Sequence, residues 1–339
     1  MNRLALGGLI ATSALVAYYM VKPLLPQRIR YLMRRLVALR LRRKSAAIWP
    51  VLPGSEAKPE GWAGWPGGAK FAVVLTHDVE GQRGLDKCRD LMKLEMACGF
   101  RSCFYFIPEG EYDLPTSLRN ELVDNGFEVA VHDLKHDGKL YQSEAAFRAA
   151  TERINHHARA WGAQGFRAGF MRHNLQWQLA LDIQHDASTF DVDPFEPQPD
   201  GVGTIFPFVV EGKDAGRPGY VELPYTLVQD STLFLFLRER SIDVWKRKLD
   251  WVAQHGGMVM LITHPDYMDF SAGTPPWNEY SADRYRELME YISTRYAGQY
   301  WHALPHEVAS HCRTFWPVTS SATAEASSLA TETTTRAGS

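Results

Sequence analysis

The sequence predicts an α/β protein, an incomplete or distorted (β/α) barrel of seven to eight units, preceded by an N-terminal membrane segment. Two observations favour this class. Short apolar runs rich in β-branched residues alternate with amphipathic helical stretches, which is the pattern of a parallel sheet made of βα units. Polar residues also follow several of these runs, at the strand ends where catalytic groups gather in such a barrel.

Each predicted strand is a nearly continuous apolar run, as expected for a strand that is buried on both faces. The predicted strands are residues 70–77, 102–108, 127–132, 165–169, 258–264 and 299–304. The predicted helices repeat apolar residues at helical spacing, and the first three end in glycine. They are residues 85–99, 114–126, 143–162, 175–183, 242–257, 282–298 and 306–315. The region between the fourth and fifth helices has no clear period, so we expect it to be irregular.

The flanking segments differ in composition from this central region. Residues 1–22 are predicted to anchor the chain in a membrane, because residues 4–21 are uncharged and about long enough to cross a bilayer. A cleaved signal peptide or an interfacial segment is the alternative. Residues 67–317 form the predicted catalytic domain. Residues 318–339 are rich in Ser, Thr and Ala and are predicted to be a disordered tail.

Residues 23–66 are predicted to form a basic juxtamembrane helix followed by a linker rich in Pro and Gly. The helix repeats apolar residues at helical spacing among arginines, as a membrane-surface helix would; they are Ile29, Leu32, Met33, Leu36 and Leu39. A solvated basic linker is the alternative. Because the basic residues follow the apolar run, the positive-inside rule places the catalytic domain on the cytoplasmic side, with a periplasmic or extracellular position as the alternative.

Composition gives little support to a nucleic-acid partner. The net charge is −2, and the basic residues of the first 55 positions cluster beside the apolar run. The four cysteines show no CxxC pair and no metal-ligand spacing. Any metal site must therefore be built from histidine and carboxylate side chains.

Two histidines and two carboxylates have the spacing and setting of a metal site. His132 and His136 follow the strand at 127–132, and a separation of four residues lets two imidazoles converge on one ion. Asp78 and Glu80 follow the first strand, where a turn or cap carboxylate is the alternative reading. One of the two acids could bind a divalent cation while the other faces a substrate. A second pair, His302 and His306, has no accompanying carboxylate loop and is interpreted as structural.

Two further residues complete a catalytic set. Arg167 in GFRAG is a candidate ion-pair partner for the carboxylate that acts as a base, with a structural salt bridge as the alternative. His264 follows the strand at 258–264, and its near-neutral pKa suits a general acid that protonates a leaving amine. A histidine that merely caps the strand is the alternative.

Taken in order, these motifs resemble those of the polysaccharide deacetylase family, carbohydrate esterase family four, over about residues 69–316. The acidic motif is matched by Thr76-His77-Asp78-Val79-Glu80, and the HxxxH motif by His132 to His136. The arginine motif, the aspartate-aromatic motif and the late histidine are matched at Arg167, around Asp186, and at His264.

The resemblance implies a fold and a reaction: an incomplete (β/α) barrel, a divalent metal, most simply Zn²⁺, and removal of an acetyl group from an N-acetylated sugar or polysaccharide. It also implies roles for single residues. Asp78 would be the base, oriented by Arg167, and His264 would be the acid, oriented by Asp186. His132 and His136 would bind the metal.

The acidic motif departs from the commonest family pattern, in which two acids are adjacent. The second acid would fall on Val79, which cannot bind a metal. Asp78-Val79-Glu80 is similar to the acid-x-acid variant of the family, which implies that Glu80 is the third metal ligand. Two alternative functions follow from these departures: a metal-dependent amidohydrolase that acts on a small non-carbohydrate amide, and a catalytically silent, membrane-tethered binding protein.

Overall fold

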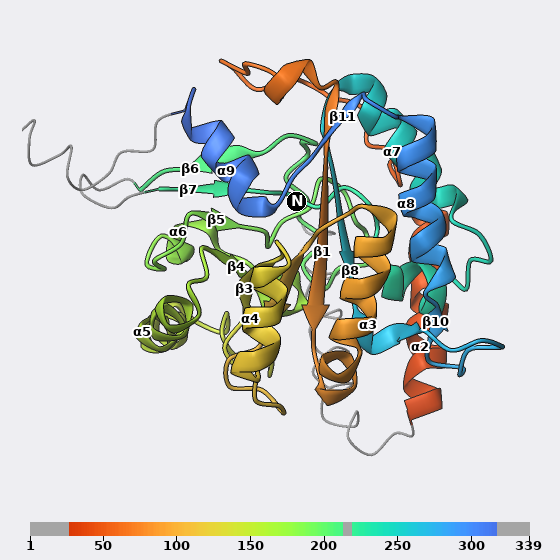
Figure 1. Ribbon diagram of the computed structural model, residues 1–339, viewed down its shortest axis with the longest axis horizontal. Helices are drawn as coiled ribbons and strands as arrows, with labels where there is room; N and C mark the ends of the chain where they lie inside the picture. Colours follow the sequence, from red (N-terminus) through yellow and green to blue (C-terminus); the bar gives the residue numbers. More distant parts are fainter. Residues whose placement is uncertain (1–26, 213–218, 317–339) are drawn as a thin grey trace, which may run out of the picture.

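A curled nine-stranded sheet organises the chain, which is described here by a computed structural model for residues 27–212 and 219–316 (Figure 1). The strand order is β11-β1-β2-β3-β4-β5-β7-β6, and β8 also pairs with β1. The strands of this sheet are β1 (Phe71–Val79), β2 (Cys103–Phe106), β3 (Glu128–His132), β4 (Gly165–Arg167), β5 (His185–Asp186), β6 (Phe208–Val210), β7 (Tyr220–Glu222), β8 (Met258–Thr263) and β11 (Tyr300–His302). A second sheet contains β9 (Met268–Asp269) and β10 (Tyr280–Ser281).

The sheet is parallel except at β6, and it curls back toward its starting strand. β1 pairs with β8 over Ala72–His77 and with β2 over Thr76–Val79. The segment after β7 returns to the other side of β8 through a parallel bridge between Leu227 and Leu261. These pairings give a distorted barrel, which confirms the barrel part of the predicted fold class.

Helices cover the outside of this sheet (Figure 1). They are α2 (Gln27–Lys44), α3 (Gln82–Cys98), α4 (Thr116–Asp124), α5 (Glu144–Trp161), α6 (Leu175–Gln178), α7 (Asp243–His255), α8 (Asp283–Arg295) and α9 (Pro305–Arg313). The short turns are 3-10 helices η2 (Pro66–Gly68), η3 (Gly169–Met171) and η5 (Pro265–Tyr267), and the π-helical η4 (Ser231–Phe236). Gly99 and Gly162 end α3 and α5 in the left-handed conformation, as the sequence predicts.

The two sides of each strand belong to different hydrophobic clusters. Along β1, Ala72 and Val74 pack inside the barrel with residues of the other strands, whereas Val73, Leu75 and Val79 pack outward against the helices. Because side chains alternate along a strand, this assignment fixes which later residues point inward. At the opposite end of the barrel, Trp65 and residues of α9 join the interior cluster.

The described residues include only part of the segments predicted to flank the barrel. The apolar run at residues 4–21 and the tail at 318–339 lie outside the described residues. Within the described residues, none of the helices combines the length and apolarity needed to cross a bilayer. The basic helix predicted after the apolar run is α2.

The structure differs from the predicted elements in the middle of the chain. Residues 184–241, expected to be irregular, contain β5, β6, β7 and η4. These strands have only two or three residues, which is too short for an alternating pattern to be recognised. The helix expected at 175–183 ends at Gln178, after a single turn.

Candidate metal and catalytic site

The acidic motif lies where β1 ends, and strand alternation separates its members. Thr76 and Asp78 face the barrel interior, and Glu80 follows immediately after the strand. Val79 points to the other side and is fully buried in the outer cluster. The backbone N–H of Glu80 donates to Asp266 at 2.9 Å, and the Tyr267 hydroxyl donates to its carboxylate at 3.0 Å.

His132 is the last residue of β3, and its ring presents one nitrogen to the interior. Its Nδ1–H donates to the carbonyl oxygen of Arg167 at 3.1 Å, so Nε2 carries the lone pair. Nε2 is buried and has no hydrogen-bond partner among the described residues. Burial lowers the pKa of His132 and outweighs the opposing effect of Asp78. The lowered pKa favours the neutral imidazole, which is the form that binds metals.

His136 lies in the turn after β3 and reaches the same point from the other side. Its Nε2 is 3.4 Å from Oε1 of Glu80 and, like that of His132, is buried without a hydrogen-bond partner among the described residues. Its ring stacks on Phe170, with 4.4 Å between ring centroids.

The backbone around these histidines adopts conformations that non-glycine residues rarely adopt. Positive φ angles occur at Asp133, His136, Phe170 and Met171. Each costs on the order of 1–3 kcal/mol, and such residues cluster at functional sites. Gly169 allows this arrangement, because a Cβ there would lie 2.5 Å from Oδ2 of Asp133 and 2.7 Å from Cδ2 of His136.

Glu80, His132 and His136 form a group that fits a divalent cation. One ligand atom from each residue lies within 4.8 Å of the other two. Within the described part of the chain the two imidazole nitrogens have no hydrogen-bond partner. One carboxylate and two imidazoles are among the donor sets that divalent metals such as zinc use in catalytic sites. The three residues that the sequence predicted as metal ligands are thus brought together.

Arg167 ends β4 and is fully buried against Asp78. Its Nη1 donates to Oδ1 of Asp78 at 2.7 Å and to the Thr76 hydroxyl at 3.0 Å, and its Nε donates to the carbonyl of Ala187 at 2.9 Å. The guanidinium also lies over the Tyr105 ring, 4.1 Å from its centroid. Burial alone would raise the pKa of Asp78, but Arg167 and His132 outweigh burial and lower it to about 2.

His264 follows β8 and faces the group from the opposite side. Its Nε2 is 3.9 Å from Oε1 of Glu80, and its Nδ1–H donates to Asp230 at 2.7 Å. Asp230 also accepts a hydrogen bond from the backbone N–H of His264 at 2.8 Å. Burial would lower the pKa of His264, but the Asp230 carboxylate, with help from Glu80 and Asp78, raises it to about 10.

Asp186 does not orient His264, and that prediction is wrong. Ala187 belongs to the interior cluster, so its neighbour Asp186 points to the outer side of β5. There it accepts hydrogen bonds from Gln178 at 3.0 Å and from the hydroxyl of Ser188 at 2.8 Å. Asp230, the residue before η4, forms the hydrogen bond with His264 that the sequence analysis assigned to Asp186.

Sequence reasoning also missed Asp266 and Tyr267, which hold Glu80 from behind. Asp266 accepts hydrogen bonds from the backbone N–H groups of Glu80 and Gly84, at 2.9 and 3.2 Å. Both residues follow His264 directly in HPDY, and this adjacency was the one available signal. No pattern marked Asp230, which lies in a region without a recognisable period.

The second histidine pair is structural, as predicted. His302 Nε2 accepts from the backbone N–H of Arg101 at 2.9 Å, while His306 contacts Glu128. The two imidazole rings therefore form hydrogen bonds with different groups.

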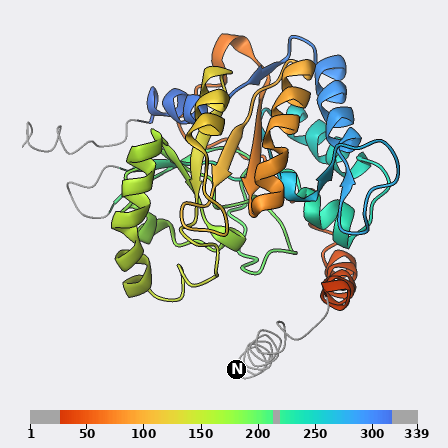
Figure 2. The same cartoon turned by 60° about the horizontal axis from the view of Figure 1, so that its bottom comes forward.

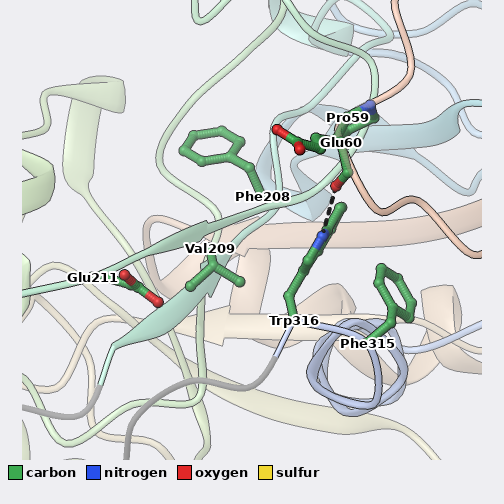
Figure 3. Close-up of a pocket in the computed structure, with 7 residues that line it drawn as sticks. All are labelled: Pro59, Glu60, Phe208, Val209, Glu211, Phe315 and Trp316. Atoms are coloured by element: carbon green, nitrogen blue, oxygen red, sulfur yellow. Dashed lines mark hydrogen bonds between the residues drawn. The ribbon is translucent and has the colours of Figure 1, made fainter.

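A cavity of about 440 Å³ lies away from the polar constellation, beside the β6 edge of the sheet (Figure 3). It is lined by Pro59, Glu60, Phe208, Val209, Glu211, Phe315 and Trp316. The Trp316 indole donates to the carbonyl of Glu60 at 2.9 Å and closes one side. Neither the candidate metal ligands nor Asp78, Arg167 and His264 line this cavity.

Comparison with known proteins defines the fold. No protein-family model and no curated protein sequence matches the chain. A Mycobacterium smegmatis protein classed as a polysaccharide deacetylase superposes with a TM-score of 0.56 at 18% identity, covering 78% of this chain and 96% of that chain. The chain therefore has a polysaccharide deacetylase-like fold.

Two other solved structures superpose less closely. The chitin deacetylase from Colletotrichum lindemuthianum has a TM-score of 0.41 at 12% identity, covering 74% of this chain and 92% of that chain. A family 4 carbohydrate esterase from Streptomyces lividans in complex with acetate has a TM-score of 0.39 at 12% identity, covering 67% and 90%. Of the three, the M. smegmatis protein alone superposes well enough to define the fold.

Proposed function

We propose that this protein is a metal-dependent hydrolase that removes the acetyl group from an N-acetylated sugar or polysaccharide. The observation that carries the proposal is the convergence of Glu80 with two buried imidazole nitrogens that have no hydrogen-bond partner among the described residues. The polysaccharide deacetylase-like fold supports the same class of reaction.

Glu80, His132 and His136 would hold the cation, and Zn²⁺ suits their two imidazoles and one carboxylate. When bound, such a cation acidifies a water molecule and polarises the acetyl carbonyl. Hydrogen bonds from neighbouring residues hold the proposed ligands in place before a cation binds. Arg167 holds the His132 tautomer through its carbonyl oxygen, while Tyr267 and Asp266 fix the side chain and backbone of Glu80.

Asp78 and His264 have the protonation states that base and acid require. Arg167 occupies Oδ1 of Asp78, which leaves Oδ2 to accept a proton from the attacking water; Oδ2 lies 3.8 Å from Nε2 of His132. Asp230 occupies Nδ1 of His264, so Nε2 carries the proton that the leaving amine needs. The products are acetate and a free amine, formed by the addition of one water molecule across the C–N bond.

The test compares His132→Ala with His306→Ala, a matched histidine from the structural pair. We expect His132→Ala to lose bound metal and acetate release from N-acetylated chito-oligosaccharides together, while His306→Ala keeps both. Elemental analysis and an acetate assay are the readouts. Full activity in metal-free protein would refute the proposal.

The same assay separates the two alternative functions. Acetate release from a small linear acetamide without activity on the oligosaccharides would identify an amidohydrolase of another specificity. Stoichiometric metal with no hydrolysis of either substrate would identify a silent binding protein.

A further inference from the structure

Helix α2 has one face that packs against the barrel and one face that does not. On the packed face, Tyr31 contacts Phe236 and Trp277, with ring centroids 5.7 and 5.1 Å apart, and Ala38 is buried. Arg42 forms an ion pair with Glu239. These contacts hold the helix to the turn that contains η4, at the margin of the molecule (Figure 2).

The opposite face of α2 exposes a run of large apolar side chains, followed on the same side by Arg40. Its large hydrophobic side chains are Ile29, Leu32, Met33, Leu36 and Val37, and their exposed fractions run from 41% to 60%. Their positions, separated by three, four, seven and eight residues from the first, place them on one side of the helix. Among the described residues, nothing covers this face, which is called the outward face below.

The charge around the outward face identifies what covers it. α2 contains no acidic residue, and its last turn is Arg42, Arg43 and Lys44. Arg28 and Arg34 lie over the rings of Trp277 and Phe236 at the flanks of the helix. An apolar stripe bordered by arginines complements a surface that is apolar inside and anionic at its edge. A second copy of the helix would bring like charges together.

The chain preceding α2 supports the same occupant. Residues 4–21 are uncharged and apolar, and they end close to the start of α2. Any association of that run with a bilayer would bring α2 to the bilayer surface. Trp277, which is 40% exposed and lies beside Tyr31, adds an aromatic side chain of the kind enriched at membrane interfaces.

We propose that the outward face of α2 lies in the surface of an anionic lipid bilayer. The helix then orients the barrel as well as tethering it. In Figure 1, α2 lies toward the end of the barrel at which the β1 arrow ends. This inference does not depend on the proposed hydrolase activity.

The experiment places an environment-sensitive fluorophore on the outward face of the full-length protein, at Leu36→Cys. The matched control is Val123→Cys on α4, a distant apolar side chain that is 53% exposed. Both variants carry Cys98→Ala, since Cys98 is the one partly exposed native cysteine among the described residues. Emission and quenching by spin-labelled lipid are measured with phosphatidylcholine vesicles that contain or lack phosphatidylglycerol.

We expect the label at position 36 to shift to shorter wavelength and to be quenched by the lipid when phosphatidylglycerol is present. Raising the salt concentration should weaken both effects, because salt screens the arginines. The label at position 123 should not respond.

Two results would overturn the proposal. A label at position 36 that stays solvent-like while the protein sediments with the vesicles would show that the outward face is not in lipid. A label that is already shielded without vesicles would show another occupant: the chain's own N-terminal segment if shielding is independent of protein concentration, or a second copy if it increases with concentration.

Discussion

Replacing Asp230 with asparagine tests the acid assignment directly. The side chain has the same shape, and its amide oxygen can still accept a hydrogen bond from Nδ1 of His264. The negative charge is lost. Because that charge is the main influence raising the pKa of His264 to about 10, the variant leaves burial as the dominant influence, and burial lowers the pKa.

The size of the effect follows from the two protonation equilibria. In the native protein, His264 is almost fully protonated at pH 8. In Asp230→Asn, we expect its pKa to fall to about 6.5 or below, so that about 3% of molecules carry the proton at pH 8. If His264 protonates the leaving amine, kcat/KM at that pH should fall by about 30-fold, and the alkaline limb of the pH profile should move toward neutrality.

Two assays check this chain of reasoning. NMR titration of the His264 ring in metal-free protein measures the pKa, and acetate release as a function of pH measures the consequence. Asp250→Asn is the control, because Asp250 accepts hydrogen bonds from Tyr291 and Tyr296, and among the described residues it makes none with His264. An unchanged His264 titration in Asp230→Asn, or an unmoved alkaline limb, would refute the assignment.

Three other outcomes are expected. Gly169→Ala should weaken metal binding by calorimetry more than it lowers the melting temperature, because its Cβ would lie 2.7 Å from the His136 ring; equal metal affinity would contradict this. Arg167→Met should destabilise the fold by about 3–5 kcal/mol in urea denaturation, since it strands the buried Asp78 carboxylate; a loss below 1 kcal/mol would show that the ion pair is not needed. Burial would raise the pKa of Glu128, but its histidine partners lower it from 4.5 to about 2. Its ionised form therefore contributes about 3 kcal/mol that is present above pH 4.5 and lost as pH falls through 2, and Glu128→Gln should flatten the acid limb of stability measured by denaturation.

The sequence predicted the site residues best where they lie at the end of a recognisable strand. β1, β3 and β8 are long apolar runs, and the residues that close them were visible as soon as the runs were recognised. The carboxyl ends of parallel strands meet at one end of a barrel. That rule alone predicted that Glu80, His132 and His264 would lie together.

The sequence did not predict the hydrogen-bond partners of site residues that lie in turns. Asp230 directly precedes the π-helical segment η4, whose sequence, STLFLF, has neither a strand period nor a helix period that differs from its surroundings. Asp186 was chosen instead because the family's aspartate-aromatic motif was matched around it. The error is one of direction, since β5 is two residues long and its inward side could not be read from the sequence.

The separation of roles between Asp78 and Glu80 follows from the strand that carries them. β1 remains extended as far as Val79, so residues two apart point to the same side while Val79 points into the outer core. The deeper acid meets the buried guanidinium of Arg167, and the next one, nearer the mouth, meets His136. Arg167 holds one oxygen of Asp78 as an ion pair, and the carboxylate that lies with the two imidazoles is that of Glu80, as the proposed roles require. Arg167 is itself held inside the barrel, because it also donates hydrogen bonds to the Thr76 hydroxyl and the Ala187 carbonyl oxygen.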